Sequence, residues 1–234
     1  MNFNNTAHHH KLNPKLWQDT QLKPEVRLML LKIAEDFKQY VGVPFTVIDV
    51  IIAGSNASFN YTEQSDLDLH LIVNFDSIEC DRAAQELFDS KRRLYKKDHD
   101  LSIYNIPVEV YAEDLDHPAI SSSYSVLNKQ WIKHPNNNPP VTDPAELEHM
   151  VKVWDQVIQT VKDKNDLKSA RNIMGLLVRY RQLGLELKDG EFSIPNLVYK
   201  RLRNSSSLKQ LQSVIDDLHN QELSLKAGDN GTSA

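Results

Sequence analysis

Two aspartates separated by one residue lie in an otherwise apolar stretch of the sequence, Ser65 to Val73. If this stretch is a β-strand, Asp66, Asp68 and His70 point to one face of the sheet, because side chains along a strand alternate. Two carboxylates on one face repel each other and reduce the β-propensity of the strand. A divalent cation removes that repulsion, and hard cations such as Mg²⁺ prefer carboxylate oxygens. The spacing therefore predicts a metal site.

A third carboxylate, Glu109, lies in a later apolar stretch between two valines that point the opposite way. If the two strands are neighbours, Glu109 joins Asp66 and Asp68 at one point on the same face. Glu113 and Asp114 satisfy a similar spacing argument, but only the neighbours of Glu109 fix its direction. A triad of this kind can hold two Mg²⁺ ions, or Mn²⁺, one activating a hydroxyl and one neutralising a leaving group.

The glycine-serine pair Gly54-Ser55 directly follows a stretch rich in valine and isoleucine, residues 45–53. Glycine lets the backbone approach a phosphate closely, and the amide groups and the Ser55 hydroxyl can bind its oxygens. A phosphate loop beside a carboxylate triad is typical of phosphoryl or nucleotidyl transfer. The sequence thus predicts that this loop and the triad act together.

The elements that must position these residues can be read from periodicity and from residues that end helices. We expect a helix from Pro24 to Gly42, strands over 45–53 and 66–73, and a helix over 77–97 that ends in the basic cluster Lys91–Lys97. One or two strands interrupted near 105–107 follow, and 121–133 adds a further strand. Beyond an Asn/Pro-rich linker at 136–140, every element is predicted to be helical, beginning with a capped helix at Asp143.

Length and composition place few limits on function, and the domain limits follow from the position of the linker. The chain has 234 residues, a formal charge of −5 and one cysteine, Cys80. These values favour a cytoplasmic protein and disfavour one that coats nucleic acid nonspecifically. We predict an N-terminal arm (1–22), a core (23–135), a helical domain (141–225) and a disordered tail (226–234), and no membrane span.

The pattern as a whole resembles the DNA polymerase β-type nucleotidyltransferase superfamily, over about residues 24–133. The resemblance is carried, in order along the chain, by Gly54-Ser55, Ser65-Asp66-Leu67-Asp68 and Glu109. The whole chain is also similar to uncharacterised nucleotidyltransferase-like proteins of tailed bacteriophages, which would place it in the host cytoplasm. The resemblance implies an α+β fold in which a small mixed β-sheet core, backed by helices, precedes a helical domain.

The resemblance also implies roles for individual residues. Asp66 and Asp68 would ligate both metal ions, and Glu109 would ligate the catalytic metal and act as, or position, the base. Gly54, Ser55 and Ser65 would bind the nucleotide. The expected reaction transfers a nucleoside monophosphate from an NTP such as ATP to a hydroxyl and releases pyrophosphate.

One position departs from the family pattern. Small antitoxin-like members carry Arg-Gly shortly after Gly-Ser, whereas this chain has Ser58-Phe59. The triphosphate therefore lacks one cation, and helical partner domains in the superfamily commonly supply such cations. Arg171, Arg179 and Arg181 of the helical half are the candidates. Arg179 and Arg181 cannot share one face of a helix, so at most one of them is expected to reach the nucleotide, and the prediction names Arg179.

Several alternatives remain open at this stage. Asp66 and Asp68 could be the charged face of an edge strand, and His70 could support a carboxylate, contact a base or be a half-buried polar residue. A Ser–His–Asp hydrolase built on Ser55 and His70 lacks the Gly-x-Ser-x-Gly elbow. A catalytically silent nucleotide sensor on the same fold is the main alternative function. The sequence does not determine the acceptor, which could be RNA, protein, a nucleotide or a small molecule. It also does not determine the preferred NTP, the oligomeric state or the role of Lys91–Lys97.

Overall fold

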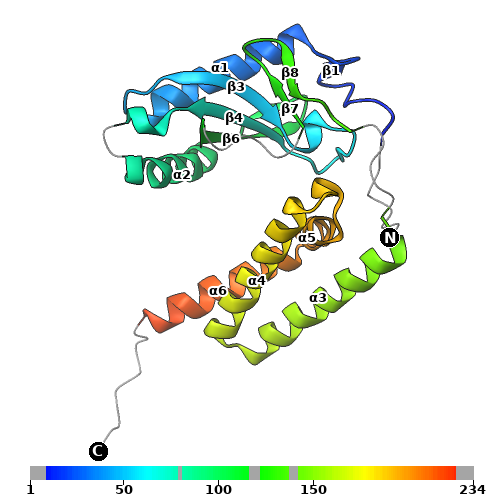
Figure 1. Ribbon diagram of the computed structural model, residues 1–234. Helices are drawn as coiled ribbons and strands as arrows, with labels where there is room; N and C mark the ends of the chain where they lie inside the picture. Colours follow the sequence, from blue (N-terminus) through cyan, green and yellow to red (C-terminus); the bar gives the residue numbers. More distant parts are fainter. Residues whose placement is uncertain (1–8, 79–80, 116–121, 137–141, 225–234) are drawn as a thin grey trace, which may run out of the picture. The chain divides into compact units, whose positions relative to one another are not determined.

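The computed structural model describes residues 9–78, 81–115, 122–136 and 142–224 (Figure 1). The chain divides into two compact units, Met1–Asn138 and Pro139–Ala234. The division falls in the predicted linker. Residues 137–141 of that region and the predicted disordered tail, 226–234, lie outside the described residues, as does Cys80.

The first unit is built on a six-stranded sheet with the strand order β5-β6-β4-β3-β7-β8. Strands β4 and β6 are parallel, and the other neighbouring pairs are antiparallel, so the sheet is mixed, as predicted. In chain order the strands are β3 (Val47–Ala53), β4 (Leu67–Val73), β5 (Ser102–Ile103), β6 (Ile106–Asp114), β7 (Ser123–Ser125) and β8 (Gln130–Lys133).

Two strand boundaries differ from the predicted ones because a turn residue adopts a positive φ. Tyr104 and Asn105 have φ angles of 51° and 63°, which form the tight turn between β5 and β6. Strand β6 therefore begins at Ile106 instead of being interrupted there. Lys129, with φ of 57°, lies in the turn that divides 121–133 into the hairpin β7–β8 rather than one strand.

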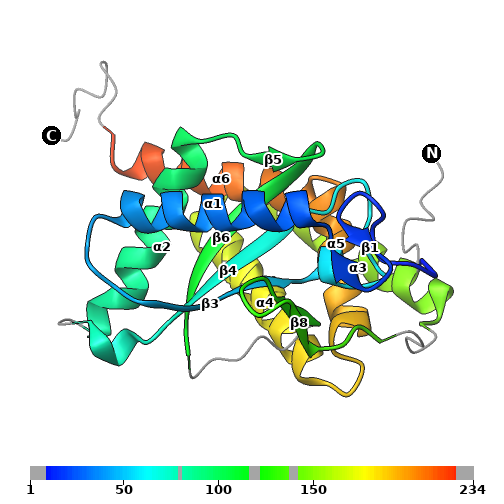
Figure 2. The ribbon, with the colours of Figure 1, turned by 90° about the horizontal axis from the view of Figure 1, so that it is seen from above.

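Helices α1 (Pro24–Val41) and α2 (Asp81–Asp98) pack on the sheet, and α1 runs across β4 and β6 (Figure 2). Leu67, Leu69 and Leu71 of β4 are fully buried in the core that these helices share with the sheet. Each such leucine contributes roughly 2 kcal/mol through burial. The prediction that these leucines face the core is confirmed, and the alternating residues of β4 must therefore lie on the other face.

The N-terminal segment, predicted as an arm, is packed into the first unit where the structure describes it. It forms a short hairpin of β1 (Trp17–Gln18) and β2 (Gln21–Leu22). Leu16 is fully buried, and the Trp17 ring stacks on Trp131 with 5.0 Å between centroids. These side chains extend the core, so the described part of this segment belongs to the first unit and is not a separate arm.

The second unit consists of α3 (Pro144–Lys164), α4 (Leu167–Glu186), α5 (Ile194–Asn204) and α6 (Ser207–Glu222) around one apolar core. The predicted cap is present, because the Asp143 carboxylate accepts a hydrogen bond of 2.8 Å from the Ala145 amide. Asp166 caps α4 in the same way through Ser169. Within the described part of the chain, every helix is too short or too polar to cross a bilayer.

Candidate functional site

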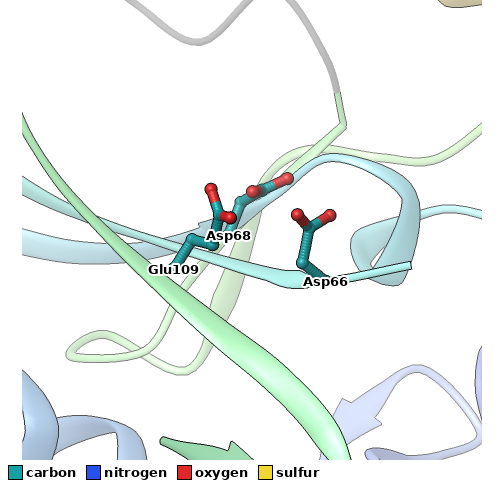
Figure 3. Close-up of side chains that lie close together, drawn as sticks. All are labelled: Asp66, Asp68 and Glu109. Carbon is teal, nitrogen blue, oxygen red and sulfur yellow. The ribbon is translucent and has the colours of Figure 1, made fainter. Parts of the chain in front are cut away.

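The three predicted carboxylates lie together on the face of the sheet opposite to the leucines. Asp68 of β4 is directly paired with Glu109 of the parallel strand β6, and Asp66 immediately precedes β4. One oxygen from each carboxylate lies within 4.8 Å of the others (Figure 3). The prediction that Asp66, Asp68 and Glu109 converge on one point is therefore confirmed by the register of β4 and β6.

Glu109 is held by cations from α2 and by a tyrosine. Lys96 Nζ donates a hydrogen bond to Glu109 Oε1, and the Tyr111 hydroxyl donates to Oε2 over 2.6 Å. Burial by itself would raise the pKa of Glu109, but these hydrogen bonds and the charges of Lys96 and Arg92 outweigh it. The pKa of Glu109 is lowered, so this carboxylate is ionised at neutral pH.

Tyr111 connects the triad to two further polar side chains on the same face. Its ring is stacked on His70, with 4.8 Å between centroids, and the Arg92 guanidinium lies 4.6 Å from the ring centroid. Burial, the charge of Asp68 and the hydrogen bond to Glu109 raise the pKa of Tyr111. The hydroxyl therefore remains a hydrogen-bond donor to Glu109.

The contacts of His70 favour one of the roles that the sequence left open, the support of a neighbouring carboxylate. His70 Nδ1 lies 2.9 Å from Glu113 Oε1, and its ring packs on Tyr111. These contacts fix the orientation of Tyr111 and, through it, of Glu109. Glu113, the alternative third carboxylate, is used in this pair.

Gly54 lies beside the triad because β3 pairs antiparallel with β4, which places Ala53 opposite Asp68. Its φ of 75° and ψ of −155° define a backbone conformation that is essentially restricted to glycine. A Cβ atom at this position would collide with the Asp68 carboxylate. The glycine is therefore required by the contact between the loop and the triad, in addition to any contact with a phosphate.

The other predicted nucleotide-binding residues lie in different places. Ser55 is half-buried at the start of the 3₁₀ helix Ser55–Ala57. The Ser65 hydroxyl accepts a hydrogen bond of 2.9 Å from the Thr62 amide and so closes the turn before β4. Arg179 is exposed on α4, in the second unit. Arg181 Nε donates to Asn196 within that unit.

Comparisons with family models, curated proteins and solved structures found no match. The functional argument therefore depends on the geometry of the site. A divalent metal ion is implied by the resemblance and fits the residues present, since three carboxylate oxygens within 4.8 Å of one another are a suitable ligand set for Mg²⁺ or Mn²⁺. An ion bound there would compete with Lys96 for Glu109.

Sequence reasoning missed Asn56, a fully buried residue that joins the Gly54 loop to the triad. Its side-chain Nδ2 donates to the carbonyl oxygen of Asp66 over 2.7 Å, and its Oδ1 accepts from Asn13 over 2.9 Å. Its own carbonyl oxygen accepts from Trp17 Nε1 over 2.8 Å. The polar residue directly after Gly54-Ser55 was a weak signal for this role.

We predict that Asn56→Ala lowers the free energy of unfolding by about 3 kcal/mol, because it leaves a half-buried carbonyl and a buried amide without these partners. Urea denaturation followed by tryptophan fluorescence measures this change. Gln64→Ala, an exposed change in the same loop region, is the control and should stay within about 0.5 kcal/mol of the wild type. Equal stability of the two variants would contradict the role of Asn56.

Proposed function

We propose that this chain is a metal-dependent nucleotidyltransferase that transfers a nucleoside monophosphate from an NTP to a hydroxyl acceptor. The observation that supports this proposal is the convergence of Asp66, Asp68 and Glu109 beside a loop whose backbone conformation requires glycine. Three carboxylates this close together repel one another unless a bound cation offsets their charge. The sheet and its covering helices are compatible with the nucleotidyltransferase core that the sequence resembles.

In the proposed reaction, the oxygen of an acceptor hydroxyl forms a bond to the α-phosphorus of the NTP. The bond between that phosphorus and the oxygen bridging to the β-phosphate breaks, and pyrophosphate leaves. Mg²⁺ held by Asp66, Asp68 and Glu109 would supply charge neutralisation and lower the pKa of the attacking hydroxyl. Glu109, which is ionised, is our candidate for accepting the hydroxyl proton.

The remaining residues would orient the donor and the base. The Gly54 loop lies on the β3 side of the carboxylates, where its backbone would bind the phosphates of the NTP. Tyr111 and Lys96 hold the Glu109 side chain from the other side. His70, through its contact with Tyr111, is a positioning residue and has no direct part in the reaction.

The test is incubation of the pure protein with each α-³²P-labelled NTP and Mg²⁺, with and without total RNA and cell extract. Gel and thin-layer separation then show which molecules carry label. We expect label on RNA, on protein or on a small product with the wild type and not with Asp66→Asn. No transfer with the wild type, while NTP binding is still detected, would favour the silent nucleotide sensor instead.

A further inference from the structure

A surface pocket of about 160 Å³ opens beside Glu109, between β6 and the C-terminal half of α2. Strand β5 is paired with β6 only at Ile106 and Pro107, so α2 is the element that packs along β6 beyond that point. The pocket is therefore formed entirely within the first unit. Glu109 belongs both to its wall and to the carboxylate triad.

The pocket carries a net positive charge. Its wall contains Arg92, Arg93 and Lys96, and Glu109 is the one carboxylate among the residues that line it. Arg93 is exposed and can turn towards a bound molecule, whereas Lys96, whose side chain is 66% exposed, adds its charge from its contact with Glu109. The pocket therefore favours an anion next to the proposed metal site.

Arg92 adds a specific feature to this charge. Its guanidinium is fixed over the Tyr111 ring, while its Nε atom is buried without a hydrogen-bond partner in the part of the chain that the structure describes. A buried donor without a partner is unfavourable, and a guanidinium binds phosphate oxygens through paired donors. A phosphate group, whose oxygens can accept from this donor and lie near the cations of the wall, therefore matches this pocket better than a neutral group.

The order of the strands separates this pocket from the Gly54 loop. The loop follows β3, Asp66 and Asp68 belong to β4 and its start, and the pocket lies at β6. The two sites thus flank the carboxylates from opposite sides. In a displacement at phosphorus, the attacking and leaving oxygens are roughly in line on opposite sides of the phosphorus.

We propose that the pocket of Arg92, Arg93 and Lys96 binds a phosphate group of the acceptor, so that the acceptor is a nucleotide or a short oligonucleotide. The inference rests on the proposed function and names its substrate class. The bound phosphate itself does not react; it holds the acceptor so that a hydroxyl of the same molecule lies beside Glu109. The net charge of −5 favours a small acceptor over a long RNA, which would be repelled elsewhere on the surface.

The test measures binding in EDTA and without NTP, so that its result does not depend on whether transfer occurs. The probe is a short fluorescein-labelled oligouridylate, followed by fluorescence anisotropy at low ionic strength, with uridine monophosphate and uridine as competitors. The variants are Arg93→Gln, Lys96→Gln and the double variant. Lys97→Gln, which removes the same charge from the same helix at a residue outside the pocket wall, is the matched control.

We expect each single variant to weaken binding about fivefold and the double variant about 25-fold, while Lys97→Gln changes it less than about twofold. Displacement by uridine monophosphate and not by uridine would identify a mononucleotide acceptor. Failure of uridine monophosphate to displace the probe would identify an oligonucleotide. The proposal is overturned if the probe does not bind, if uridine competes as well as its monophosphate, or if the double variant binds like Lys97→Gln.

Discussion

Asp68→Asn is expected to abolish metal-dependent stabilisation and nucleotidyl transfer together, and to make the metal-free protein more stable. In EDTA, the substitution removes one of three negative charges whose oxygens lie within 4.8 Å of one another. We expect the free energy of unfolding to rise by about 1 kcal/mol, as for the removal of a like charge from an opposing pair on a sheet. With Mg²⁺, the loss of a shared ligand should lower the transfer rate by about three orders of magnitude.

Urea denaturation in EDTA and in saturating Mg²⁺ measures the stability part without knowledge of the acceptor. The wild type should gain stability with Mg²⁺, because the ion binds the native state and not the unfolded one, whereas Asp68→Asn should gain little. Asp76→Asn, which removes an exposed aspartate of the same unit, is the control and should respond to Mg²⁺ like the wild type. An equal response of Asp68→Asn would show that Asp68 is not a ligand.

The geometry of the triad could be predicted because the alternation of apolar and polar residues in β4 and β6 allows few registers between the two strands. Both strands have their apolar residues at alternate positions, and a slip of one residue would bury Asp68 and Glu109 and expose the leucines. The fold class and most helices followed from equally local signals, such as the Asp143 cap. The direction of each carboxylate and the ends of the helices depend on residues that are neighbours in the sequence, whereas the pairing of β4 with β6 was a condition of the prediction.

The parts of the site that could not be predicted depend on contacts between distant segments. Asn13 and Asn56 are 43 residues apart, and their buried hydrogen bond follows from the packing of the N-terminal hairpin, which had been predicted as an arm. The contact of Arg92 with Tyr111 requires that α2 packs along β6, which periodicity alone does not specify. The break between β5 and β6 was predicted near residues 105–107, but its position at Tyr104 and Asn105 was not, because no glycine marks it.

Gly54→Ala is expected to lower the free energy of unfolding by about 3 kcal/mol and to suppress transfer. A residue with a Cβ is strained at φ 75° and ψ −155°, and the added atom would collide with the Asp68 carboxylate. The loop must then move or the carboxylate must turn away from the triad. Either movement separates the phosphate-binding backbone from the proposed metal ligands.

A double-mutant cycle separates the two causes of this loss. In an Asp68→Ala background the collision is absent and only the backbone strain remains, so Gly54→Ala should be less costly there than in the wild type. Gly175→Ala, in α4 with open space around it, is the control and should raise stability by up to about 1 kcal/mol. If Gly54→Ala lowers the free energy of unfolding equally in both backgrounds, the Asp68 carboxylate can move aside without loss of stability. The close approach of Gly54 to Asp68 would then not constrain the metal site, and the glycine would be explained by backbone conformation alone.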